Sequence, residues 1–280
     1  MEIKKILNNN VVVTENKDGG EIIVMGRGLA FKAKAGQTID ESKIDKTFTL
    51  GDGERDSHFI RLLGDMDMSE FDFAEEMINF AKMDLGKNLS NTVYVTLIDH
   101  INTCKERAEA GAYINNTMLW DMKRLYKDEF RTAREIVRRM NVRFGAAFDD
   151  NEAATIATHL VNAEMDTDLG TVIRITRVIT EILNIVKYHF NIVYDEDSLA
   201  YYRFMTHLRF FAERIFTGKG YTDDNDELFQ MIIEKYPDMY ECTLRISDFI
   251  EDKYQYKLEN EEALYLTVHI AKVVRESRSV

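Results

Sequence analysis

The sequence predicts a multidomain protein: a small N-terminal all-β antiparallel sheet domain followed by two tandem all-α helical bundles. Residues 1–50 hold short β-rich stretches separated by turn-forming residues, and residues 44–50 alternate between apolar and polar positions. From about residue 65 onward the alternation gives way to helical periodicity, and a histidine pattern occurs there twice. We therefore expect domains at residues 1–55, 65–169 and 170–280.

The N-terminal domain is expected to contain strands at Val11–Thr14, Glu21–Met25 and Ile44–Leu50. A hairpin turn at residues 15–20 joins the first two, and residues 51–56 resemble a linker. A sheet of about 50 residues buries little apolar surface by itself, so dimerisation would help it persist.

The helical part contains a duplicated module that carries two histidines in each copy. The pattern H-x5-E-R-x3-G comprises His100, Glu106, Arg107 and Gly111, and then His207, Glu213, Arg214 and Gly218. The pattern E-A-x5-H comprises Glu152, Ala153 and His159, and then Glu262, Ala263 and His269. Two copies are too few for a solenoid, which favours tandem bundles.

Each of these four histidines lies in an apolar stripe at helical spacing, which predicts an imidazole facing a packed surface. His189 fits the same local pattern but has no counterpart in the first copy. Helix-start signals at Asp149–Glu152 and Asn260–Glu262 precede the second histidine of each copy. The duplication therefore selects His100, His159, His207 and His269.

Bulk composition indicates a soluble cytoplasmic protein without a membrane span. Of 280 residues 45% are hydrophobic, no apolar run approaches a spanning length, and the two cysteines lie far apart. The net charge of −13 belongs almost entirely to the part after residue 50, because residues 1–50 hold eight Lys/Arg and seven Asp/Glu. The N-terminal segment is therefore nearly neutral, whereas the rest of the chain is acidic.

Two N-terminal strings carry a family resemblance. Lys4-Lys5-Ile6-Leu7-Asn8-Asn9-Asn10-Val11 and Met25-Gly26-Arg27-Gly28-Leu29-Ala30-Phe31 resemble the RNA-binding co-antiterminator domain of the BglG/SacY/LicT transcriptional antiterminators. The two histidine modules resemble the paired phosphotransferase-system regulation domains that follow it, and the likeness spans the whole chain. Within this family the strings resemble those of LicT-like regulators of β-glucoside use. Thr103-Cys104-Lys105 and Thr206 depart from the usual pattern, which bears on the tuning of each module.

The resemblance implies a sugar-responsive antiterminator that acts as a homodimer. Such proteins bind an RNA antiterminator hairpin in nascent leader transcripts and prevent an overlapping terminator from forming. A sugar-specific transporter component of the phosphotransferase system phosphorylates the first module and inactivates the protein. The general phosphocarrier protein phosphorylates the second module, which usually activates it.

The RNA-binding residues that we expect use shape, stacking and base-edge contacts, because the segment has few cations for phosphate neutralisation. They are Lys5, Asn8, Asn10, Gly26, Arg27, Gly28 and Phe31. Without the resemblance, composition would favour an ordinary tight turn at Gly26–Gly28, a core role for Phe31 and a solvated loop at Asn8–Asn10.

A neutral imidazole accepts a phosphoryl group as a nucleophile, so all four duplicated histidines are candidate phosphorylation sites. The alternative is an inherited packing role. Arg107 and Arg214 follow His100 and His207 by about two helical turns and are candidate phosphate-receiving residues. Their alternative role is an ion pair within the module. Met118, Met122, Phe210, Phe211 and Phe229 are predicted core.

Two other functions fit the sequence less well. A helical phosphohydrolase of the HD type requires a His-Asp dipeptide, which this sequence lacks. A DNA-binding activator with the same regulation modules requires an N-terminal helix-turn-helix, where this chain alternates as a strand does. The acidic run at residues 223–227 is expected to be a solvated loop and not a calcium-binding loop. We expect no enzymatic activity, no cofactor and no metal site.

Overall fold

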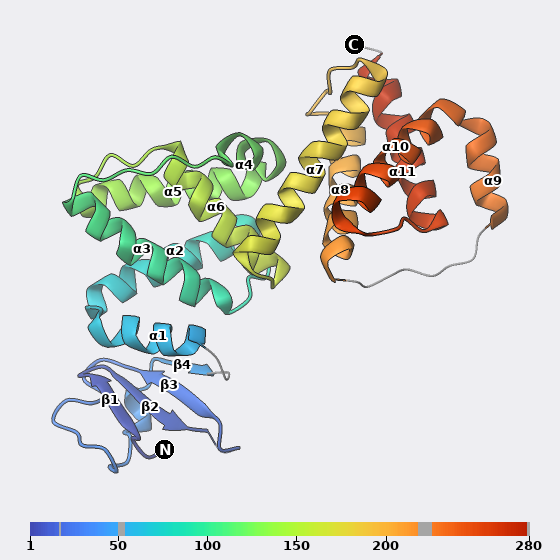
Figure 1. Cartoon of the computed structure of the whole chain (residues 1–280). Coiled ribbons are helices and arrows are strands. Elements are labelled where there is room, and N and C mark those ends of the chain that lie inside the picture. The colour runs from blue at the N-terminus through green and yellow to red at the C-terminus, as the bar shows by residue number, and fades with distance from the viewer. Residues whose placement is uncertain (17, 50–53, 218–225, 279–280) are drawn as a thin grey trace. The chain divides into compact units, whose positions relative to one another are not determined.

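The computed structural model describes residues 1–16, 18–49, 54–217 and 226–278. These ranges leave out Lys17 of the expected turn, Leu50 of the expected last strand, residues 51–53 of the expected linker, Gly218, and residues 223–225 of the acidic run. The described chain divides into two compact units, residues 1–119 with 128–166 and residues 120–127 with 167–280. The predicted fold class is confirmed, because in the described ranges an antiparallel sheet is followed by helices (Figure 1).

The N-terminal sheet has four antiparallel strands in the order of the chain. They are β1 (Lys5–Asn8), β2 (Val11–Glu15), β3 (Glu21–Met25) and β4 (Lys46–Thr49). A 3-10 turn, η1 (Glu41–Lys43), precedes β4. Two of the expected strands match β2 and β3, and β4 begins at Lys46, two residues later than expected. An N-terminal helix-turn-helix is ruled out, because this segment forms a sheet.

Both faces of the two central strands are buried. Val12 and Val24, which are register partners, lie on one face in a core with Ile3, Ile22 and Leu29. Val13 and Ile23, also paired, are buried on the opposite face. Runs of β-branched residues suit such a sandwiched position, which explains why no polar residue alternates with them.

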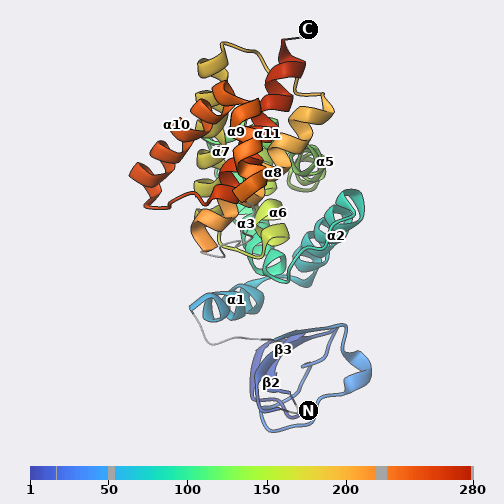
Figure 2. The same cartoon turned by 90° about the vertical axis from the view of Figure 1, so that its right-hand side faces the viewer.

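Helix α1 (Glu54–Asp65) lies against the sheet, on the side of the first-unit helices (Figures 1 and 2). Its Phe59 is buried and meets Phe48 of β4 edge-on, with ring centroids 5.5 Å apart. The prediction that residues 51–56 form a linker is therefore wrong for residues 54–56, which belong to this helix. The buried apolar face of α1 stabilises it through tertiary packing.

The remaining helices of the first unit are α2 (Met68–Leu85), α3 (Thr92–Glu109), α5 (Lys127–Phe144) and α6 (Asp150–Met165). Helix α3 packs against both α2 and α6. The predicted start of α6 is confirmed, since the Asp149 carboxylate accepts a hydrogen bond from the Asn151 backbone N–H.

The second unit contains α4, α7, α8, α9, α10 and α11. Their bounds are Leu119–Leu125, Leu169–Phe190, Leu199–Thr217, Asp226–Lys235, Pro237–Tyr254 and Asn260–Ser277. Short α4 joins this unit although both of its chain neighbours, α3 and α5, belong to the first. Tyr126 Oη lies 3.1 Å from Thr176 Oγ1 of α7, and the Thr180 hydroxyl donates to Asp121 at 2.9 Å.

Helix α11 packs against α8 and α10 as α6 packs against α3 in the first unit. Its start is fixed by a capping box, in which Glu259 and Glu262 each accept a hydrogen bond from the other's backbone N–H. No helix in the described ranges combines the length and hydropathy that a membrane crossing requires.

Candidate functional site

Each unit brings its two duplicated histidines together at a helix–helix contact. His100 of α3 and His159 of α6 have ring centroids 4.9 Å apart. His207 of α8 and His269 of α11 have ring centroids 3.9 Å apart. The duplicated sequence pattern therefore corresponds to a duplicated pair of imidazoles.

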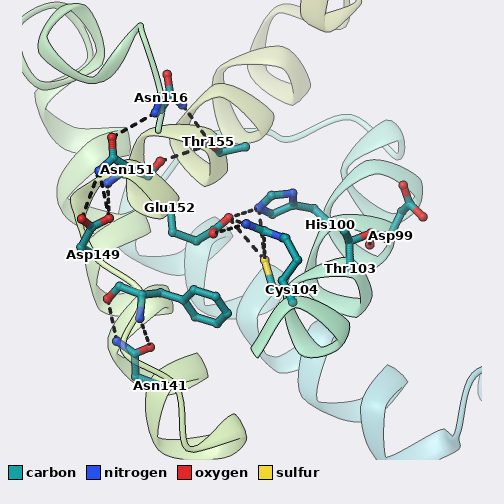
Figure 3. Close-up of polar contacts among 12 residues, drawn as sticks. Asp99, His100, Thr103, Cys104, Asn116, Asn141, Asp149, Asn151, Glu152 and Thr155 are labelled. Atoms are coloured by element: carbon teal, nitrogen blue, oxygen red, sulfur yellow. Dashed lines mark hydrogen bonds and ion pairs between the residues drawn. The ribbon is translucent and has the colours of Figure 1, made fainter. Parts of the chain in front are cut away.

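The first pair is held by an acidic side chain from the start of α6. The Nε2 atom of His100 lies 2.7 Å from Oε1 of Glu152, and the Glu152 side chain is almost wholly buried (Figure 3). Arg107 approaches the same carboxylate with two nitrogens, Nη1 at 2.9 Å from Oε2 and Nη2 at 3.0 Å from Oε1. Glu152 therefore links the imidazole to the arginine of the same repeat.

Cys104 lies one turn after His100 and completes this network. Its Sγ atom lies 3.5 Å from Nε2 of His100, 3.3 Å from Oε1 of Glu152 and 2.9 Å from Nη2 of Arg107 (Figure 3). Burial and the neighbouring Glu152 carboxylate raise the pKa of the Cys104 thiol. The thiol is therefore protonated at neutral pH, and donates to the carboxylate.

Burial alone would raise the pKa of Glu152, but hydrogen bonds from His100 and Arg107 outweigh it and lower that pKa to about 2. Burial, with the charge of His100 adding to it, lowers the pKa of His159 to about 3. At neutral pH the site therefore holds an ionised Glu152 and a neutral His159, whose Nδ1 is buried without a hydrogen-bond partner.

His100, Cys104 and Glu152 offer ligand atoms that lie within 4.8 Å of one another, which is a spacing that a metal ion can use. The Arg107 guanidinium already neutralises this carboxylate and contacts the thiol. A divalent cation would have to displace it, so the geometry fits a hydrogen-bonded network better than a metal centre.

The second pair has a different environment. Arg214 donates from Nε to Oε1 of Glu262 at 3.0 Å, which repeats the Arg107–Glu152 ion pair. The Tyr256 hydroxyl donates to the same carboxylate at 2.9 Å, and Phe211 stands at the position of Cys104 in the repeat. None of the described contacts joins His207 to Glu262.

A cavity of about 280 Å³ lies beside the second pair. Its lining includes His207, His269, Arg214, Glu262, Phe210 and Tyr265. Burial, with help from Arg214, lowers the pKa of His207, and burial together with His207 lowers that of His269 to about 4. A neutral imidazole and an arginine thus border a space that is large enough for a phosphoryl group.

Two expectations about this second pair are wrong. His207 is exposed in the single chain and does not face a packed surface. Phe210, predicted as core, is 56% exposed at the cavity. Met122, Phe211 and Phe229 are buried as predicted, whereas Met118 is half-buried.

The expected RNA-binding residues divide into exposed and structural ones. Phe31 is 63% exposed, which excludes the alternative that it belongs to the core. Arg27 is also exposed and forms an ion pair of 2.9 Å with Asp72, and Lys5 is exposed on β1. Gly28 adopts φ +66°, and a side chain at this position would meet open space. These residues are available to a ligand.

The other three maintain the sheet. Asn8 donates from Nδ2 to the Leu63 carbonyl at 2.8 Å and accepts at Oδ1 from the Asn10 backbone N–H at 2.8 Å. The Asn10 Oδ1 accepts from the Gly28 N–H at 2.7 Å. A Cβ atom on Gly26 would lie 1.7 Å from the Lys43 carbonyl oxygen, so this glycine permits a close approach within the domain itself.

Comparison with known proteins decides the family. Residues 1–57 match the CAT RNA binding domain, and residues 75–163 and 180–273 match the PRD domain. Transcription antiterminator LicT of Bacillus subtilis (strain 168) is 46% identical over 277 residues, which cover 99% of this chain and 100% of that protein. The chain belongs to the BglG/SacY/LicT antiterminator family.

Other antiterminators are similar over nearly the same length. The beta-glucoside operon antiterminator of Dickeya chrysanthemi is 40% identical and covers 99% of this chain and 98% of its own length. A crystal structure of GlcT CAT-PRDI is 27% identical, covers 58% of this chain and 97% of that one, and has a TM-score of 0.48. A structure of LicT with its RNA target is 50% identical, covers 19% of this chain and 98% of that one, and has a TM-score of 0.19.

The sequence pointed to the four histidines and the two arginines of this antiterminator, but not to the side chains that contact them. Glu152 and Glu262 belong to the duplicated pattern, seven residues before a histidine, but the sequence suggested no role for them beyond the helix starts. Cys104 and Tyr256 have no repeated counterpart, so the duplication could not reveal them. Arg107 and Arg214 lie in ion pairs within their own modules, as the alternative interpretation expected.

Proposed function

We propose that this chain is a sugar-responsive transcriptional antiterminator whose RNA binding is controlled by phosphorylation of His100, His159, His207 and His269. The observation that carries the proposal is the occurrence, in one chain, of a CAT RNA binding domain and two PRD domains, each with a paired set of imidazoles. An enzyme is not needed to account for these features.

The RNA partner is an antiterminator hairpin, and the surface of this chain that binds it comprises Lys5, Arg27, Gly28 and Phe31. Support comes from the exposure of Phe31 and Arg27, since an exposed aromatic ring is a stacking platform for an unpaired base. Asn8, Asn10 and Gly26 act indirectly, by holding the loops that present these residues.

The controlling partners are the general phosphocarrier protein, acting on the second module, and a sugar-specific transporter component, acting on the first. The exposed His207 beside a cavity supports an acceptor that a donor protein reaches directly. The names of the relatives favour β-glucosides as the sugar class. We also propose that the chain acts in the cytoplasm and forms a homodimer. Support for the homodimer comes from Phe210 and Tyr265, which expose aromatic surface next to the second histidine pair.

A gel-shift titration of the full chain against the RNA target of LicT tests the RNA part. We expect binding that weakens at least about fivefold in Phe31→Ala, because base–aromatic stacking contributes about 1–3 kcal/mol. Arg27→Ala is expected to weaken it similarly through a lost base-edge contact. Lys257→Ala, which removes an exposed cation from the second unit, is the matched control.

Absence of binding by a folded chain, or equal effects of Arg27→Ala and Lys257→Ala, would contradict the proposal. The regulatory part is tested by repeating the titration after incubation with the phosphorylated phosphocarrier. RNA affinity that stays the same, with phosphate on His207 and His269, would contradict control by phosphorylation.

A further inference from the structure

The two histidine pairs share a fold and a duplicated sequence, yet among the described residues only the first pair has a carboxylate on its leading imidazole. The Glu152 carboxylate lies 2.7 Å from Nε2 of His100. A carboxylate that also receives two nitrogens of Arg107 is ionised and accepts hydrogen bonds only. The hydrogen between Glu152 and His100 therefore resides on Nε2, and this contact assigns the tautomer.

The second nitrogen of His100 has the opposite character. In the Nε2–H tautomer Nδ1 carries the lone pair, and Figure 3 shows this nitrogen on the side of the ring away from Glu152 and Cys104. The His100 side chain is 12% exposed, whereas His159 and His269 are buried. The nucleophilic nitrogen thus points away from the carboxylate and the thiol that hold the ring.

We propose that Glu152 is a positioning residue that directs phosphorylation of His100 to Nδ1. This inference rests on the proposed function, because it concerns the regiochemistry of that phosphorylation. Arg107 supports Glu152 by holding both of its carboxylate oxygens, at 2.9 and 3.0 Å.

The Nδ1 lone pair of His100 attacks the phosphorus of the donor's phosphoryl group, and an N–P bond forms. The bond between that phosphorus and the donor atom breaks, and its electron pair stays on the donor group, which leaves as ammonia in the case of phosphoramidate. Substituted at both nitrogens, the His100 ring gains positive charge, which the adjacent Glu152 carboxylate stabilises without moving a proton.

The described part of the second unit shows no such contact between a carboxylate and the leading imidazole. Glu262, the counterpart of Glu152, accepts hydrogen bonds from Arg214 at 3.0 Å and from Tyr256 at 2.9 Å. His207 instead lies near the rings of His269 and Tyr265, at 3.9 and 6.1 Å between centroids. Removal of the Glu262 charge should therefore leave the phosphorylated nitrogen of His207 unchanged, which makes Glu262→Gln a matched control.

The experiment uses the full chain and two donors, phosphoramidate and the general phosphocarrier of Bacillus subtilis in its phosphorylated form. Phosphorus-31 NMR at alkaline pH distinguishes the two phosphohistidine isomers. The resonance that disappears in a His100→Ala variant belongs to His100. In the wild-type chain we expect Nδ1 to exceed Nε2 by about tenfold or more at His100, the scale of one charge-assisted hydrogen bond.

In Glu152→Gln, which keeps the volume and removes the charge, we expect this ratio to approach unity. A merely structural role of Glu152 would slow labelling without changing the isomer. Circular dichroism shows whether each variant is folded. If Glu152→Gln does not fold, the ratio of the two isomers in the wild-type chain still tests the inference.

Phosphate on Nε2 of wild-type His100, or an Nδ1 preference that persists in folded Glu152→Gln, would overturn the inference and leave the proposed function intact. Labelling of the other histidines by phosphoramidate without any at His100 would overturn it too. Failure of the charged phosphocarrier to label any of the four histidines would instead count against the proposed function.

Discussion

Replacement of Gly26 by alanine tests the reasoning about the sheet most directly. The new Cβ atom would lie 1.7 Å from the Lys43 carbonyl oxygen and 2.9 Å from its carbon, both in the backbone. Neither atom belongs to a flexible side chain, so one of the two backbone segments must shift. The shift endangers the hydrogen bond from the Gly26 N–H to the Asn10 carbonyl and that from Asp45 to Met25.

Loss of two backbone hydrogen bonds costs about 1–3 kcal/mol, and overpacking of a rigid site adds a similar amount. We therefore expect Gly26→Ala to destabilise the sheet by about 3 kcal/mol. At 1.4 kcal/mol for each tenfold, amide hydrogens of β2 and β3 that exchange through opening of the sheet should exchange about 100-fold faster.

Hydrogen exchange measured by mass spectrometry on the full chain is the assay, and Gly28→Ala is its control. A Cβ atom on Gly28 meets nothing within 4 Å, so that variant bears only the cost of φ +66°, about 1 kcal/mol. If the amide hydrogens of β2 and β3 exchange at the same rate in both variants, the close approach of Gly26 to the Lys43 carbonyl does not limit the sheet and the reasoning is refuted.

Three further predictions concern the contact between the sheet and α1 and the two histidine pairs. Asn8→Ala should destabilise the contact between the sheet and α1 by about 1–3 kcal/mol in urea unfolding, because it removes the acceptor of the Asn10 N–H and the donor to Leu63; an unchanged midpoint would argue against it. The pKa of His269 is lowered to about 4 from 6.5, so the unfolded state binds the proton first and stability should fall as pH drops from about 6.5 to about 4. His269→Leu should flatten that dependence, and an equally steep profile would contradict it. Glu152 has a folded pKa of about 2 against 4.5, so its contribution should be present above pH 4.5 and disappear toward pH 2, and Glu152→Gln should show a smaller loss in that window.

The parts of the fold that the sequence revealed are those where local pattern and tertiary environment agree. Strands β2 and β3 were predictable from uninterrupted β-branched runs, and α6 and α11 from their capping residues. Strand β1 was not predicted, because its four residues pair with β2 through an irregular register and hold few strand-forming side chains. Helix α1 was not predicted either, because its stability comes from the packing of Phe59 and Leu63 in the folded domain.

The candidate site was predictable to the same extent. Duplication identified the four histidines, since it repeats residues and not merely hydrophobicity. It gave no information on the contact between His100 and Glu152, because that carboxylate comes from a different helix. Cys104 and Phe211 occupy equivalent repeat positions with different chemistry, and only the three-dimensional structure shows that this changes the surroundings of His100 relative to His207.

The placement of α4 has a consequence for how this chain comes apart. Because residues 120–127 belong to the second unit while residues 128–166 belong to the first, the backbone passes between the units three times. Proteolytic cleavage after Asp166 would leave one segment of the second unit on each side of the cut. The nicked halves would stay associated until α4 undocks from α7, and a fragment that begins at residue 167 would lack the Tyr126 and Asp121 contacts.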